Sequence, residues 1–68
     1  MPNDQQILHR LPATLARTGL SRSQLYRLIA RGEFPRPIKL AGTASAAWSS
    51  TAVSHWIEQQ LNQDAESA

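Results

Sequence analysis

The 68-residue sequence contains no cysteine and no long run of apolar residues. Disulfide bonds, thiol catalysis and cysteine-based zinc sites are therefore excluded. No apolar stretch approaches the roughly 18 residues that span a bilayer, and no basic segment followed by an apolar one marks a signal peptide. These absences lead us to expect a cytoplasmic protein without a membrane segment.

Large apolar residues are also scarce. Leu, Ile, Val and Phe together make up 14 of the 68 residues, close to the fraction of one fifth at which chains become disordered. Nearly all of them lie between Ile7 and Leu61 and recur with helical spacing. A chain of this length forms one domain at most. We therefore predict an ordered domain over residues 7–62, between a disordered N-terminus (1–6) and a disordered tail (63–68).

Acidic residues are nearly missing from the first half of the chain. All seven Lys and Arg residues lie within residues 10–39, where Glu33 is the single acid. From residue 40 onward there are three acids and neither Lys nor Arg. A basic half of this density indicates a polyanionic partner. The charge pattern alone fits a solvated charged face on an ordinary domain equally well.

Proline, glycine and serine positions predict two short helices. Pro12 suits a first helical turn, and Gly19 tolerates the positive φ that closes a helix over residues 12–18. Ser21 is a good N-cap for a second helix, which Gly32 ends. The inward stripe of this second helix consists of Leu25, Leu28 and Ile29.

The second half predicts a hairpin and a third helix. Residues 38–40 and 46–48 are short extended candidates, and residues 42–45 between them supply a turn. Ser50 is the expected cap of the third helix. Its apolar face consists of Val53, Trp56, Ile57 and Leu61. The order helix, turn, helix, hairpin, helix is that of a small, mainly α winged helix-turn-helix domain with a short β-hairpin wing and a C-terminal helix.

Spacing in the first two helices supports this fold. Leu15, Gly19, Leu25 and Leu28 stand where a helix-turn-helix needs a small turn residue between apolar contacts that fix the helix angle. An αα-hairpin with no DNA role would show much the same pattern. A rotation of 100° per residue turns Ser23, Arg27 and Ala30 away from the core.

The outward face of the second helix favours DNA recognition over a merely solvated surface. No acid occurs between Gln5 and Ala30, although exposed helices usually mix both charges. Arg22 lies in the first turn, where the helix dipole makes a cation slightly unfavourable. Arginine, serine, glutamine and tyrosine side chains suit base edges and phosphates. We predict DNA contacts from Ser21, Arg22, Ser23, Gln24, Tyr26, Arg27, Arg31, Arg36, Lys39 and Thr43.

Other conspicuous residues have structural interpretations. Trp48, Trp56 and Phe34 are expected in the core, and the ring of Tyr26 is divided between the core edge and a phosphate contact. His9 and His55 are expected to be exposed, without a metal site. The sequence shows no nucleophile–base pair, Gly-rich phosphate loop or carboxylate dyad, so we expect neither an enzyme nor a cofactor.

Several motifs together resemble a known family. They are Arg10-Leu-Pro, Thr18-Gly-Leu-Ser-Arg-Ser, Leu25-Tyr-Arg-Leu-Ile, Gly32-Glu-Phe-Pro-Arg-Pro-Ile-Lys-Leu, Ala47-Trp and Val53-Ser-His-Trp-Ile. From about Leu8 to Leu61 the chain resembles AlpA-type prophage regulatory proteins, which belong to the MerR-like and excisionase-like winged helix group. Two departures weaken the expected wing contacts. The wing loop lacks the arginine that is common in the family, and Ser49 follows Trp48 where many members have arginine.

The resemblance implies a regulator of a phage or integrated element that binds double-stranded DNA. It implies recognition by residues 21–31, a wing near residues 39–47 and control of an integrase or excision locus. Two alternatives stay open. One is an architectural excision factor that bends DNA. The other is an interaction module that holds an integrase or an RNA polymerase subunit.

The sequence predicts a monomer in dilute solution. The third helix has one apolar face, which the core needs, and few residues follow Leu61 that could form the coiled coil typical of MerR-type dimers. We expect sedimentation velocity at micromolar concentration to show a single monomeric species. A tight dimer in the absence of DNA would contradict this expectation.

Overall fold

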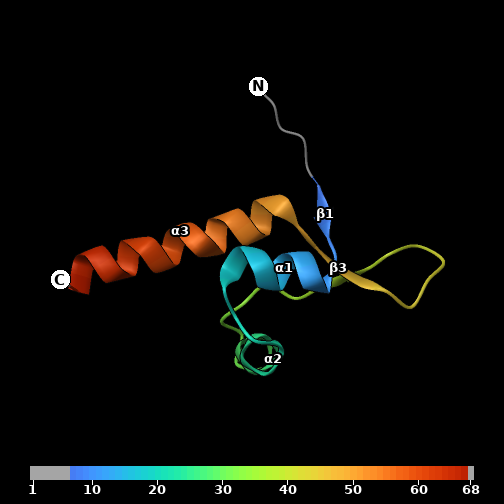
Figure 1. Ribbon diagram of the computed structural model, residues 1–68, viewed down its shortest axis with the longest axis horizontal. Coiled ribbons are helices and arrows are strands. Elements are labelled where there is room, and N and C mark those ends of the chain that lie inside the picture. The colour runs from blue at the N-terminus through green and yellow to red at the C-terminus, as the bar shows by residue number, and fades with distance from the viewer. Residues whose placement is uncertain (1–6, 68) are drawn as a thin grey trace.

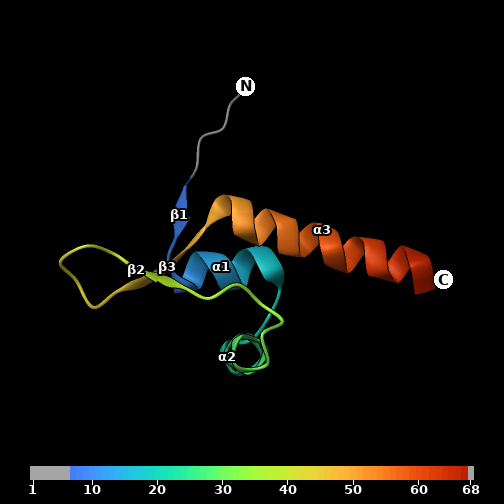
Figure 2. The same ribbon diagram turned by 180° about the vertical axis from the view of Figure 1, so that it is seen from behind.

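The computed structural model describes residues 7–67 and confirms a mainly helical fold with a small antiparallel sheet. Its elements are β1 (Leu8–His9), α1 (Leu11–Thr18), α2 (Arg22–Ala30), β2 (Ile38–Lys39), β3 (Ala46–Ser49) and α3 (Ser50–Ser67) (Figure 1). In the views of Figures 1 and 2, α1 lies between α3 and α2, and the wing loop and the end of α3 project in opposite directions. The predicted N-terminal segment 1–6 lies outside the described residues.

Local signals define the ends of the first two helices, as the sequence predicted. Gly19 has a φ of 76° and its N–H donates to the carbonyl of Leu15 at 2.8 Å, which closes α1. A left-handed residue at this position lets the chain reverse sharply into α2. At the end of α2, Gly32 has a φ of 74° and donates to the carbonyl of Ile29 at 3.0 Å.

The sheet contains the predicted hairpin and one strand that the sequence did not reveal. The strand order is β1-β3-β2, and both pairs are antiparallel. Ile38 pairs with Ala47 in the hairpin, and His9 pairs with Trp48 on the other side of β3. A strand of two residues is too short to show an alternating pattern, so β1 had no sequence signature.

The start and length of α3 differ from the prediction. Ser49 caps the helix by accepting from the N–H of Ala52 at 3.0 Å, whereas the predicted cap Ser50 instead accepts the N–H of Ile7 at 3.0 Å. The helix continues to Ser67, through most of the segment expected to be a disordered tail. Leu61 is 66% exposed, because the second half of α3 projects beyond the body (Figure 1). No helix among the described residues is both long and apolar enough to cross a bilayer.

The core is small and lies where the three helices meet the sheet. Its fully buried side chains include Leu25 of α2, Trp48 of β3 and Val53 of α3. Half-buried residues pack around them: Leu11, Leu15, Leu20, Leu28, Ile29, Trp56 and Ile57. The predicted core roles of Phe34, Trp48 and Trp56 are confirmed, with Trp56 at the edge of the core.

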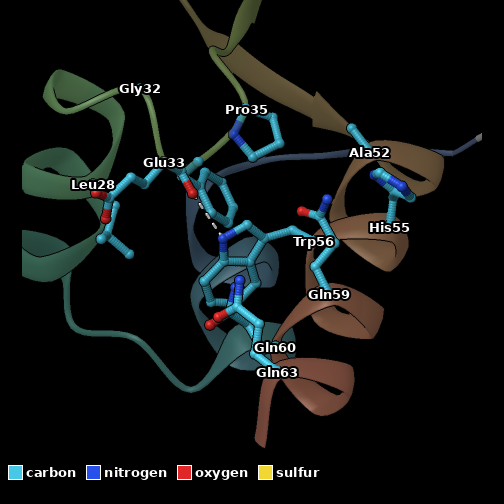
Figure 3. Close-up of a pocket in the computed structure, with 11 residues that line it drawn as sticks. Leu28, Gly32, Glu33, Pro35, Ala52, His55, Trp56, Gln59, Gln60 and Gln63 are labelled. Carbon is cyan, nitrogen blue, oxygen red and sulfur yellow. Dashed lines mark hydrogen bonds between the residues drawn. The ribbon is translucent and has the colours of Figure 1, made fainter. Parts of the chain in front are cut away.

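Both tryptophans hold the linker between α2 and β2. The indole N–H of Trp48 donates to the carbonyl of Pro35 at 2.9 Å. That of Trp56 donates to the carbonyl of Glu33, also at 2.9 Å (Figure 3). Phe34 between them is buried and packs edge-to-face on Trp56, with ring centroids 5.0 Å apart. Such an aromatic pair adds about 0.5–1.5 kcal/mol beyond its buried area. The linker therefore fixes the position of α2 relative to β3 and α3.

Two leucine-to-alanine variants test this description of the core. Leu25→Ala should lower the free energy of unfolding by about 2–5 kcal/mol, because it leaves a cavity at a fully buried site. Leu61→Ala should change it by no more than about 0.5 kcal/mol, because the side chain is exposed. Urea denaturation followed by circular dichroism measures both. A large loss in Leu61→Ala would show that another surface covers the end of α3, and would also contradict a monomer.

Candidate nucleic-acid interface

The outward face of α2 is exposed, as the helical rotation predicted. Ser23, Arg27 and Ala30 are all exposed, while Leu25 on the opposite side is fully buried. Tyr26 is 44% exposed, and it lines the groove that also contains Trp48. The small side chains of Ser23 and Ala30 leave the guanidinium of Arg27 unobstructed for a close approach to a partner.

Ser21 and Gln24 cap the N-terminus of α2. The Ser21 hydroxyl accepts the N–H of Gln24 at 3.2 Å, and the Gln24 side-chain oxygen accepts the N–H of Ser21 at 2.9 Å. This reciprocal capping satisfies two backbone donors at the start of α2. The amide N–H groups of Gln24 remain as its donors toward a partner. Both predicted contact residues thus have a structural role, and the sequence pattern indicated it only for Ser21.

Four basic side chains are exposed and make no ion pair or hydrogen bond with another described residue. They are Arg22, Arg27, Arg36 and Lys39. Two of them lie on α2, one in the linker that follows it, and one on the hairpin. Unpaired cations of this kind bind phosphates without first breaking an internal ion pair.

Arg31 is partly neutralised. Its guanidinium lies 3.7 Å from the carboxylate of Glu33, and both side chains are more than half exposed. A surface pair of this kind contributes about 0–1 kcal/mol, so a phosphate can compete with the carboxylate. Arg31 is therefore a weaker candidate than the four unpaired cations.

Two further arginines outside the predicted site make long-range contacts. Arg10 donates from Nη2 to the hydroxyl of Ser45 on the wing loop, at 2.9 Å. Arg17 donates to Nε2 of His9 at 3.1 Å and to the hydroxyl of Ser54 at 2.9 Å, and so ties α1 to β1 and α3. His9 is half-buried, which corrects the prediction of an exposed residue. No local pattern separated these two arginines, because their partners are distant in sequence.

The wing has one exposed cation, Lys39, and a hydroxyl, that of Thr43, which already forms internal hydrogen bonds. Lys39 is exposed on β2. The predicted contact residue Thr43 donates its hydroxyl to the carbonyl of Leu40 at 3.1 Å and accepts the N–H of Ser45 at 3.1 Å. The Thr43 proton therefore stabilises the turn, and a phosphate contact from this hydroxyl would have to displace that bond.

An open groove joins α2 to the wing. Its volume is about 570 Å³, and its polar lining comes from Arg10, Arg22, Tyr26 and Ser45, with Trp48 among the apolar lining residues. The start of α1, the first turns of α2 and the wing loop therefore border one surface. The sequence predicted the roles of α2 and the wing separately, and the fold brings them together.

A second hollow, of about 640 Å³, lies between α2 and α3 (Figure 3). Trp56, Gln59 and Gln60 line it together with Glu33, and no Arg or Lys does. This lining is unsuited to a polyanion. His55, which is exposed, also borders it. The described residues contain no group of three or more His, Asp or Glu side chains that could hold a metal ion.

Comparison with known proteins identifies the family. Residues 6–61 match the family described as "Prophage CP4-57 regulatory protein (AlpA)". The chain is also similar to an uncharacterized protein, ORF88, of Enterobacteria phage P4, with 40% identity over 57 residues. That match covers 84% of this chain and 64% of the relative. No solved structure is similar enough to count as a match. Because the family match spans most of the chain, including both candidate DNA-contacting elements, this protein belongs to the AlpA family of prophage regulatory proteins.

Proposed function

We propose that the chain is a sequence-specific DNA-binding regulator of a phage or integrated element, and that it acts at an integrase or excision locus. The observation that carries this proposal is the set of four unpaired cations on α2, the following linker and the hairpin. Membership of a prophage regulatory family supports the regulatory role. The name of the phage P4 relative gives no function, so the locus rests on the family resemblance.

In the proposed complex, α2 occupies the major groove and the wing lies along the sugar–phosphate backbone. Arg27 projects from the centre of the exposed face and reads a base edge, because a guanidinium can bond O6 and N7 of guanine together. Arg22, Arg36 and Lys39 bind phosphates and set the register of the helix. Ser23 and Tyr26 add shorter-range polar contacts beside Arg27.

Charge argues against an interaction module as the primary role, whereas discrimination between DNA sequences separates a regulator from an excision factor. An interaction module for integrase or RNA polymerase has no need for cations on an acid-free α2 face. An excision factor that bends DNA shares the charge pattern but needs less discrimination between sequences. A gel shift with DNA flanking the gene, with and without random competitor, separates them. A competitor-resistant complex supports the regulator, and equal binding to any duplex supports the architectural factor.

Salt dependence tests the phosphate contacts. The four unpaired cations give four phosphate contacts, and Arg10 and Arg31 can raise this number to six. The logarithm of the association constant should fall with the logarithm of salt concentration at a slope of roughly −3.5 to −5.5. Fluorescence anisotropy from 50 to 300 mM salt measures this slope. A slope near zero would contradict phosphate binding.

Two alanine variants separate base reading from backbone binding. Arg27→Ala should weaken the cognate site more than a scrambled duplex, by about 1–3 kcal/mol of discrimination, because a base contact is lost. Lys39→Ala should weaken both duplexes by similar factors and make the salt slope shallower by about one, because a lysine binds phosphate as a point charge. Paired titrations at fixed salt measure both effects.

Circular dichroism is the control for these two variants, and both should keep the wild-type spectrum because neither side chain is buried. If Arg27→Ala lowers both affinities equally, Arg27 binds a phosphate. The base-reading residue would then be Arg22, Gln24 or Tyr26.

A further inference from the structure

We propose that the groove between α2 and the wing binds a backbone phosphate of duplex DNA, and that Arg10 is its principal ligand. This inference rests on the proposed function and extends it to a residue outside α2 and the hairpin. Arg10 precedes α1 and is its N-cap residue, with an extended backbone at φ −77° and ψ 174°. Its side chain crosses to the wing loop, 35 residues further along the chain.

The hydrogen bond to Ser45 orients the Arg10 side chain and leaves most of its N–H donors free. A guanidinium has five N–H donors, and this bond uses one of them, from Nη2 at 2.9 Å. The remaining donors stay available to an anion. Because the side chain is already held by the wing, it loses less conformational freedom on binding than an unrestrained arginine does.

Arg10 also supplies a cation to the wing loop, which has none of its own. The wing loop, residues 40–46, contains neither Arg nor Lys. Through its bond to Ser45, Arg10 brings a guanidinium to this loop from 35 residues earlier in the chain. The wing loop thus acquires a positive charge in addition to that of Lys39 on β2.

The charges around the groove favour an anion. Arg10 and Arg22 both line it, no carboxylate lines it, and neither arginine pairs with an acid among the described residues. Two like charges at one groove repel each other. A phosphate bound between them offsets that repulsion, because it attracts both guanidinium groups. Tyr26 contributes a hydroxyl donor to the lining, and apolar residues such as Trp48 lower the local screening.

The form of the groove favours a phosphate that belongs to a duplex. At about 570 Å³ it is open and much larger than a single phosphate ion needs. It also runs between α2 and the wing, the two elements that flank a DNA strand in the proposed complex. A backbone that passes between them places one phosphodiester against Arg10 and Arg22 while α2 occupies the adjacent major groove.

Two glutamine variants provide a matched test. Arg10→Gln and Arg17→Gln each remove one charge, and neither arginine forms an ion pair with a described acid, but Arg17 does not line the groove. Anisotropy with a mixed-sequence duplex from 50 to 300 mM salt should show a slope shallower by about 0.9 for Arg10→Gln. The association constant at about 0.15 M salt should fall about fivefold. A slope of about 0.9 per phosphate contact makes one contact contribute a factor of about five at this salt concentration, if it contributes nothing at about 1 M. Arg17→Gln should keep the wild-type slope.

Arg10→Lys keeps the charge, and it should keep the slope as well. Each variant is measured at a temperature where circular dichroism shows it to be folded. If wild-type binding is steeply salt-dependent and Arg10→Gln has the same slope, the inference about the groove is wrong while the proposed function stands. If the wild-type protein shows no salt-dependent DNA binding, both are wrong.

A measurement on the unmodified protein distinguishes duplex from free phosphate. The Nε–H resonance of Arg10 in the ¹⁵N-labelled protein should shift on addition of one equivalent of a short duplex. Millimolar inorganic phosphate at matched ionic strength should leave it in place. An equal shift with inorganic phosphate would show a small-anion site and overturn the assignment to the DNA backbone, and so would the absence of a shift with the duplex.

Discussion

The capture of residues 33–35 by two tryptophans is the constraint on which the rest of the structure depends. Trp48 on β3 and Trp56 on α3 donate to carbonyls on either side of the buried Phe34. A domain with so few large apolar residues has little other means of fixing one helix against the body. Since the linker leads directly out of α2, holding it also sets how α2 is placed relative to β3 and α3.

That orientation explains how the basic residues are distributed. The inward face of α2 supplies Leu25 to the core, so its arginines can only face solvent. Glu33, the single acid in the basic half, has its carboxylate beside Arg31 and its carbonyl engaged by Trp56. It therefore lies at the end of α2, away from the groove at the start of that helix, and the groove keeps its positive charge.

The seven basic residues have different structural roles. Arg17 is a structural tie between α1, β1 and α3, whereas the exposed residues Arg22, Arg27, Arg36 and Lys39 are unpaired among the described residues. Arg10 combines both behaviours, because one donor holds the wing and the others remain open. The chain belongs to a family of prophage regulatory proteins, and in the proposed function the unpaired cations and Arg10 are the residues that bind DNA.

The sequence by itself determined the first two helices, the hairpin and the exposed face of α2. Each depends on signals within a few residues: the caps at Ser21 and Gly19, and the helical period of Leu25, Leu28 and Ile29. The tertiary structure alone decided β1, the exposure of Leu61 and the contact between Arg10 and Ser45. Strand pairing and side-chain contacts across 35 or more residues depend on how the elements pack, and that packing leaves no periodic trace in the sequence.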